Sequence, residues 1–140
     1  MTLHVGPGTF KPVEVENAID HPMHHERFEL DKINAKIIND AKANGGRIVG
    51  IGTTATRVLE TVANEEGLAI PQEGSTGIYI YPGYQWKLLD GLITNFHWPK
   101  STLLLLVSAL YGRENVLDSY EEAIQNEMQL FSYGEGMLIL

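Results

Sequence analysis

The chain has 140 residues, of which 44% are apolar and 20% charged, with a formal net charge of −8 and no cysteine. This composition is that of an ordinary globular domain, and it excludes a disordered or fibrous chain, a disulfide framework and a cysteine nucleophile. The acidic balance counts against a free-standing nucleic-acid binder, although it leaves a local basic contact open.

We expect a cytoplasmic protein, because the lack of cysteine fits a reducing compartment and the N-terminus shows no secretory signal. The longest purely apolar run, Leu103–Val107, has five residues, whereas a membrane span needs about 20. No repeat or linker divides the sequence. We therefore predict one domain over residues 1–140.

Residues 1–16 predict two short strands around the turn Gly6-Pro7-Gly8. Glycine adopts backbone angles that other residues resist, and proline fixes one angle. The turn is either an ordinary hairpin or a loop that presents backbone N–H groups to an anion.

Residues 20–30 hold His21, His24 and His25, three of the five histidines, beside carboxylates. The His-Glu-x-x-His spacing of zinc helices is absent and Pro22 interrupts a helix, so we predict no metal site. Imidazole titrates near neutral pH and suits acid–base chemistry. The alternative is a polar loop that leads into an extended segment, Arg27–Leu30.

Residues 31–62 predict helix, strand and helix. Ile33, Ile37, Ile38 and Ala41 recur at helical spacing after Asp31, which can cap a helix that runs to Asn44. The strand Arg47–Gly52 leads into a helix that begins near Thr53, and free N–H groups at such a helix start favour a carboxylate or phosphate. Arg57, one turn further on, either neutralises a ligand carboxylate or forms a surface pair with Glu60.

Residues 67–101 predict a loop over 67–76, strands over Gly77–Tyr81 and Trp86–Leu89, and a further strand that begins at Gly91. Four aromatic residues gather in this region, and aromatic rings either stack on nucleobases or fill a core with one polar end at the surface. They are Tyr79, Tyr81, Tyr84 and Trp86.

The corner Asn95–Thr102 joins this last strand to an apolar helix, Thr102–Tyr111. It carries an amide, an imidazole, an amine and two hydroxyls, and loops held by rigid elements commonly carry sites. The alternative is scaffold, with Ser101 or Thr102 as a helix cap and Pro99 as a strand stop.

A helix over Glu114–Leu130 and a strand over Met137–Leu140 complete the expected elements. Helices and strands alternate along the chain, which favours an α/β sandwich with helices on both faces of a sheet.

Six motifs together resemble the S-adenosylmethionine:tRNA ribosyltransferase-isomerase family of the queuosine pathway. They occur in the family's order over nearly all of the chain. They are Leu3-His4-Val5-Gly6-Pro7-Gly8-Thr9-Phe10, Asp20-His21-x-Met23-His24, Gly52-Thr53-Thr54-x-x-Arg57-x-Leu59-Glu60, Ile80-Tyr81-Pro82-Gly83-Tyr84, Leu92-Ile93-Thr94-Asn95-Phe96-His97-x-Pro99-Lys100-Ser101-Thr102 and Phe131-Ser132-Tyr133-Gly134. The sequence departs from the family at Ala55-Thr56, where Ser-Val is usual, and at Gly134-Glu135-Gly136, where Gly-Asp-Ala is usual.

The resemblance implies a fold and a reaction. The fold is a three-layer α/β/α sandwich with a mixed sheet, the C-terminal part of the family's large domain, without the family's small β-barrel-like domain. The reaction transfers the ribosyl group of S-adenosylmethionine to 7-aminomethyl-7-deazaguanine in tRNA and isomerises it to epoxyqueuosine, releasing adenine and methionine. S-adenosylmethionine is then a substrate, and no bound prosthetic group is expected.

The resemblance also implies site residues. The catalytic candidates are His97, Asn95, Lys100, His21 and His24. The substrate-binding candidates are His4, Gly6, Gly8, Thr9, Phe10, Gly52, Thr53, Thr54, Arg57, Tyr81, Tyr84, Phe96, Ser101 and Thr102. Because the family's N-terminal half precedes the first motif, we expect the chain alone either to be inactive or to self-associate through an exposed strand edge. The alternative function is a non-catalytic nucleoside-binding or small-molecule-binding module of the same fold.

Overall fold

The computed structural model describes residues 1–6, 12–133 and 135–140. Two three-stranded sheets are seen in this part of the chain. The first is antiparallel, in the order β1 (Thr2–His4), β2 (Glu26–Leu30) and β4 (Gln72–Thr76). The second is mixed, because β3 (Val49–Ile51) runs parallel to β5 (Gly91–Asn95) and β5 runs antiparallel to β6 (Gly136–Ile139). The α/β class and the mixed sheet are thus confirmed.

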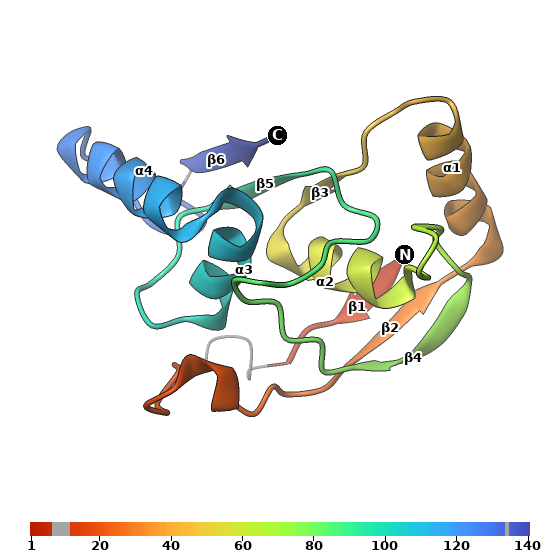
Figure 1. Ribbon diagram of the computed structural model, residues 1–140, viewed down its shortest axis with the longest axis horizontal. Coiled ribbons are helices and arrows are strands. Elements are labelled where there is room, and N and C mark those ends of the chain that lie inside the picture. Colours follow the sequence, from red (N-terminus) through yellow and green to blue (C-terminus); the bar gives the residue numbers. More distant parts are fainter. Residues whose placement is uncertain (7–11, 134) are drawn as a thin grey trace.

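Helix α2 (Thr53–Val62) connects the two sheets, since it contacts strands of both. Helix α1 (Lys32–Ala43) and the first sheet lie toward one side of the molecule, and α3 (Thr102–Tyr111), α4 (Arg113–Gln125) and β6 toward the other (Figure 1). A short 3-10 helix, Ala18–Asp20, precedes β2. The core runs through the middle, where Val58, Leu92 and Val107 are fully buried.

Two glycines shape the helix ends. Gly52 (φ 86°) precedes α2, and Gly112 (φ 89°) separates α3 from α4, so both adopt angles that residues with a side chain resist. Ser101 caps α3 by accepting the Leu104 N–H at 3.2 Å. The helix predicted over Thr102–Tyr111 is confirmed at both ends, and α4 ends five residues before the predicted Leu130.

The mixed sheet buries one face and leaves the other exposed in this chain. Gly50, Leu92 and Ile139 lie side by side on the buried face. On the opposite face, Ile51, Ile93 and Leu138 form a cross-strand row with exposed fractions of 75%, 42% and 59%.

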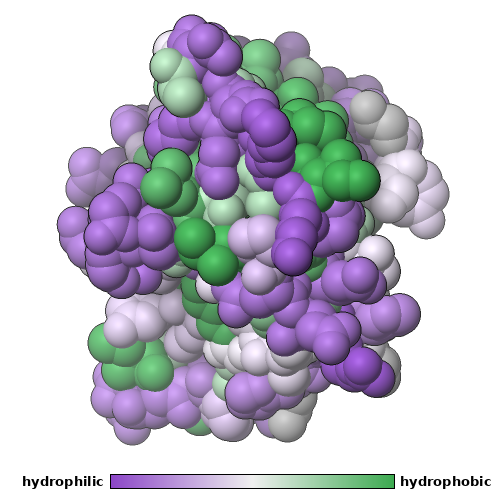
Figure 2. Space-filling model, turned by 90° about the vertical axis from the view of Figure 1, so that its right-hand side faces the viewer, coloured by the Kyte–Doolittle hydropathy of each residue, from purple (hydrophilic) through white to green (hydrophobic). Residues whose placement is uncertain are grey.

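Helix α1 begins where expected, with the Asp31 carboxylate accepting the Asn34 N–H at 2.9 Å. Its expected apolar face is wrong, because Ile33 and Ile37 are exposed whereas Ala35 and Ile38 pack inward. Figure 2 views the molecule from the side on which α1 lies in Figure 1, and it shows apolar patches among the polar surface.

The expected N-terminal hairpin is also wrong. Strand β1 pairs with β2, so that Leu3 lies opposite Phe28. Residues 12–16 form no strand, and the Val13 N–H instead donates to the carbonyl of Lys100 at 2.9 Å. The turn itself, with the candidates Gly8, Thr9 and Phe10, lies outside the described residues.

Two expected strands between residues 77 and 89 are wrong as well. The strand next to β2 is Gln72–Thr76, inside the expected loop, and Gly77–Tyr81 has no ladder partner among the described residues. Over Trp86–Leu89 the backbone N–H groups of residues 87, 88 and 89 donate to the carboxylate of Glu60 at 2.9–3.0 Å. The Glu60 side chain therefore accepts the backbone hydrogen bonds that a neighbouring strand would otherwise accept.

Candidate functional site

A buried ion pair between Arg57 and Glu26 joins α2 to β2. Arg57 Nη1 lies 2.6 Å from Glu26 Oε2, and the side chains are only 5% and 1% exposed. The other oxygen, Glu26 Oε1, accepts the Gly6 N–H at 3.0 Å and lies 3.1 Å from His24 Nε2. The fold thus brings Gly6, His24 and Arg57 together around Glu26. No periodicity or motif of the sequence singles out Glu26, so its role was not predicted.

Arg57 keeps one edge of its guanidinium open. Its Nε and Nη2 atoms are buried and have no hydrogen-bond partner in the described part of the chain. These two N–H groups point in parallel, the geometry that matches the two oxygens of a carboxylate or phosphate. The alternative of a surface pair with Glu60 is wrong, because Glu60 is 2% exposed and bonds elsewhere.

The start of α2 lies one turn before Arg57 on the same helix. Thr53 is buried, Thr54 is partly exposed, and no side chain caps the first turn among the described residues. The Gly52 N–H is already used, donating to the Ile93 carbonyl at 2.7 Å. The uncapped helix start and the unpaired guanidinium edge both belong to α2, and each of them favours an oxyanion.

The other histidines of residues 20–30 have separate surroundings. His21 is 7% exposed, and its ring centre lies 6.0 Å from that of Tyr79. His25 packs over Gly77, where a Cβ atom would come within 2.7 Å of the imidazole Nε2. Tyr81 continues the aromatic contacts, 5.1 Å from Tyr79.

The corner Asn95–Thr102 is held by bonds of its own. Asn95 Nδ2 donates to the Glu135 carbonyl at 2.9 Å, and Ser101 Oγ donates to the Trp98 carbonyl at 2.8 Å. Lys100 adopts a φ of 56°, which is uncommon outside glycine. Asn95 and Ser101 therefore both act as scaffold, whatever else they contact.

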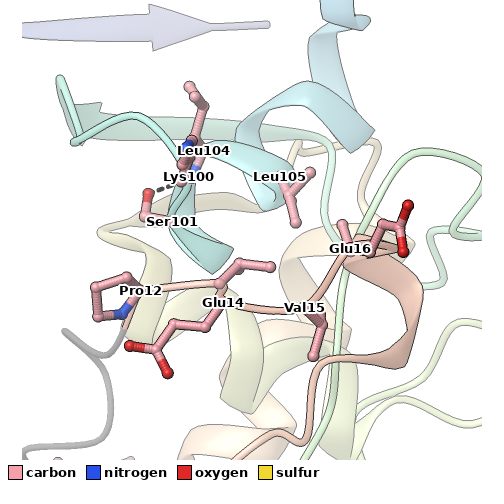
Figure 3. Close-up of a pocket in the computed structure, with 10 residues that line it drawn as sticks. Pro12, Glu14, Val15, Glu16, Lys100, Ser101, Leu104 and Leu105 are labelled. Atoms are coloured by element: carbon pink, nitrogen blue, oxygen red, sulfur yellow. Dashed lines mark hydrogen bonds between the residues drawn. The ribbon is translucent and has the colours of Figure 1, made fainter.

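A groove separates this corner from residues 12–18. It includes a cavity of about 660 Å³ between Glu14, Glu16 and Val15 on one side and Lys100, Ser101 and Leu105 on the other (Figure 3). A second cavity, of about 430 Å³, shares Pro12 and Lys100 and extends to Trp98 and Phe131. The rings of Trp98 and Phe131 lie 5.4 Å apart with an angle of 59° between their planes. Trp98 is 59% exposed, so the groove offers an aromatic surface beside a lysine.

His97 lies away from this groove, against α4. It lines an apolar cavity of about 290 Å³ with Phe96, Tyr120, Met128 and other residues. Its Nε2 is 3.5 Å from Thr94 Oγ1, its Nδ1 is buried without a partner in the described residues, and its backbone N–H donates to the Tyr120 hydroxyl at 2.7 Å. Burial lowers the pKa of His97 from 6.5 to about 4, so the ring is neutral at pH 7.

This burial predicts a pH dependence of stability. A histidine that is harder to protonate folded than unfolded stabilises the chain fully above the unfolded pKa of 6.5, and that contribution is lost as the pH falls toward about 4. The full contribution is about 3 kcal/mol. In urea unfolding at pH 7 and pH 4.5, His97→Gln should reduce the stability difference between the two pH values. His4→Gln, at an exposed position, is the matched control and should leave this stability difference unchanged. The same stability difference in both variants would contradict the role given to the burial of His97.

The remaining candidates are mostly packed. Tyr84 donates to Glu60 Oε2 at 3.2 Å and its ring lies 5.2 Å from Trp86, while burial and then the Glu60 charge raise the pKa of Tyr84. Phe96 and Thr102 are buried, and Phe96 stacks edge-on with Tyr120. For Tyr84 this arrangement favours the core interpretation over stacking on a base.

The described residues show neither a group of metal ligands nor a membrane-spanning helix. No three histidine or carboxylate side chains among residues 1–6, 12–133 and 135–140 are grouped to hold a metal ion. Within the same ranges no helix has the length and apolar character to cross a membrane.

Comparison with known proteins gives consistent matches. The family described as "Queuosine biosynthesis protein" matches residues 1–139. Proteins named S-adenosylmethionine:tRNA ribosyltransferase-isomerase are similar to the chain. The one from Caldanaerobacter subterraneus is 53% identical over 140 residues, covering 100% of this chain and 41% of the relative. The one from Fusobacterium nucleatum is 55% identical over 137 residues, covering 98% and 39%.

A solved structure of a protein with a similar name also matches the chain. The crystal structure of S-adenosylmethionine tRNA ribosyltransferase from Thermotoga maritima matches with a TM-score of 0.74 and 41% identity, over 82% of this chain and 40% of that one. The chain therefore spans about 40% of the length of these relatives. On the match over residues 1–139, the chain belongs to the queuosine biosynthesis protein family.

Proposed function

We propose that this chain is part of an S-adenosylmethionine:tRNA ribosyltransferase-isomerase. The observation that carries the proposal is identity of 53–55% to proteins of that name over 98–100% of this chain. The reaction would transfer the ribosyl group of S-adenosylmethionine to 7-aminomethyl-7-deazaguanine in tRNA, isomerise it, and release adenine and methionine in the cytoplasm.

The open edge of Arg57 would bind the carboxylate of the methionine part of S-adenosylmethionine. The two free N–H groups are buried, and a buried donor without a partner is costly, more so when it carries charge. A ligand carboxylate would satisfy both groups at once. The uncapped first turn of α2, with Thr53 and Thr54, adds a favourable dipole on the same helix.

The reaction also needs a base, and the surroundings of the histidines favour His24 over His97. His97 has its pKa lowered to about 4 and lies in an apolar cavity, so it is a weak base there. His24 is partly exposed and lies beside the carboxylate that holds Arg57. The groove beside Trp98 and Lys100 would take a planar base of the nucleoside or of tRNA.

The test is adenine release from S-adenosylmethionine in the presence of tRNA that carries the modified base. It compares this chain alone with a chimera in which the chain replaces the matching segment of the Caldanaerobacter subterraneus relative. We expect release by the chimera. Saturable binding of S-adenosylmethionine without release by the chimera would favour a non-catalytic binding module, which the coverage of only about 40% of the relatives keeps as the second candidate.

Self-association also remains a prediction. The exposed row Ile51, Ile93 and Leu138 favours the open face of the mixed sheet over its edge as the contact surface.

A further inference from the structure

Glu26 is the residue on which three separate segments converge. It is the first residue of β2 and is 3% exposed. Its two oxygens contact the backbone N–H of Gly6 at the end of β1, Nε2 of His24 in the preceding loop and Nη1 of Arg57 on α2. Each of these groups faces a carboxylate that can only accept hydrogen bonds.

We propose that Glu26 is a positioning residue, which fixes the proton on Nε2 of His24 and orients the open edge of Arg57. The nitrogen that faces an ionised carboxylate at 3.1 Å carries the hydrogen. In a neutral imidazole the other nitrogen, Nδ1, then holds the lone pair. Glu26 thereby decides which nitrogen of His24 is basic.

The same carboxylate sets the orientation of Arg57. Glu26 Oε2 accepts a hydrogen bond from Arg57 Nη1 at 2.6 Å. The donors Nε and Nη2 on the other edge of the guanidinium are therefore the ones without a partner in the described residues. The charge of Arg57 balances that of Glu26. That Nδ1 acts as the general base, and that the open edge binds a substrate carboxylate, rests on the proposed function.

The proton position can be read without any substrate. We would record long-range ¹H–¹⁵N correlations of the histidine rings in this chain at a pH where His24 is neutral. We expect the Nε2–H form of His24 to predominate in the unmodified chain. A predominant Nδ1–H form would overturn the proposal before any variant is made.

The variant Glu26→Gln gives the second reading. The glutamine oxygen should turn to the charged Arg57 donor, because charge-assisted hydrogen bonds are roughly twice as strong as neutral ones. Its amide NH₂ group then faces His24 Nε2, which must accept, so the population should shift to Nδ1–H. Glu29→Gln, on the exposed face of the same strand, should leave the His24 signals unchanged.

A folded Glu26→Gln chain with His24 still in the Nε2–H form would overturn the proposal. His25 serves as the internal reference, since it packs over Gly77 and should keep its form in both variants. If the chain gives the expected ring signals but the chimera releases no adenine, the proposed reaction is contradicted and the role of Glu26 is not.

Discussion

Replacing Glu60 with alanine should lower the free energy of unfolding by about 4 kcal/mol, because it leaves three backbone donors of residues 87–89 without an acceptor. Glu60 is 2% exposed and accepts these N–H groups at 2.9–3.0 Å together with the Tyr84 hydroxyl at 3.2 Å. Each buried donor that loses its acceptor costs about 1–3 kcal/mol. Since a domain is typically stable by about 5–15 kcal/mol, the loss would remove a large part of the stability.

Urea unfolding followed by circular dichroism measures this cost. Glu65→Ala is the matched control, because the Glu65 side chain is 85% exposed and makes one surface ion pair with Lys87. We expect that control to change the stability by less than about 1 kcal/mol. A Glu60→Ala chain as stable as the control would mean that water or another side chain satisfies the three donors.

The distance along the chain between contacting residues explains which elements could be predicted from the sequence. Local signals that act on neighbouring residues were sufficient for α3, where Ser101 caps the start and Gly112 ends the helix with a positive φ. The alternative interpretation of residues 20–30 expected an extended segment Arg27–Leu30 after a polar loop, and β2 begins one residue earlier, at Glu26. The determining contacts of α3 thus lie within a few positions along the chain, whereas β2 pairs with residues 2–4 and 72–76.

The wrong predictions share the opposite property. Trp86–Leu89 has the apolar character of a strand, but its backbone bonds to Glu60, more than 25 residues earlier. Strand β4 is mostly exposed and polar, Gln72–Thr76, so it lacks the apolar alternation that marks a strand. Its pairing with β2 is a long-range contact that no local pattern encodes.

The site residues show the same contrast between local and long-range contacts. The motif placed Arg57 on a helix near its start, and the structure agrees. Its partner could not be predicted, because Glu26 lies 31 residues away and the sequence favoured the neighbour Glu60 by helical spacing. His97 stood out by its motif, while its burial against α4 depends on residues such as Tyr120 and Met128.

The buried pair itself gives the second large prediction. Arg57→Met and Glu26→Gln should each lower the free energy of unfolding by about 3–5 kcal/mol, because each leaves one charge buried without its partner. The double variant buries no net charge. It should therefore be more stable than either single variant, because replacing both partners of a buried ion pair is often nearly neutral whereas removing one partner is not. Arg47→Met, at an exposed position, is the control for the change of residue type.

Binding separates this structural effect from recognition of the substrate. In the chimera, S-adenosylmethionine should bind better than its decarboxylated analogue, and Arg57→Met should remove about 10- to 100-fold of that preference, the range for a charge-assisted hydrogen-bonded pair. The double variant should regain part of the stability but none of the preference, since it still lacks the Nε and Nη2 donors. If the double variant regained both, Arg57 would serve only to balance Glu26, and the carboxylate site would have to lie elsewhere. If it regained stability alone, the open edge of Arg57 would be the recognition element, because restoring the fold would not have restored the preference.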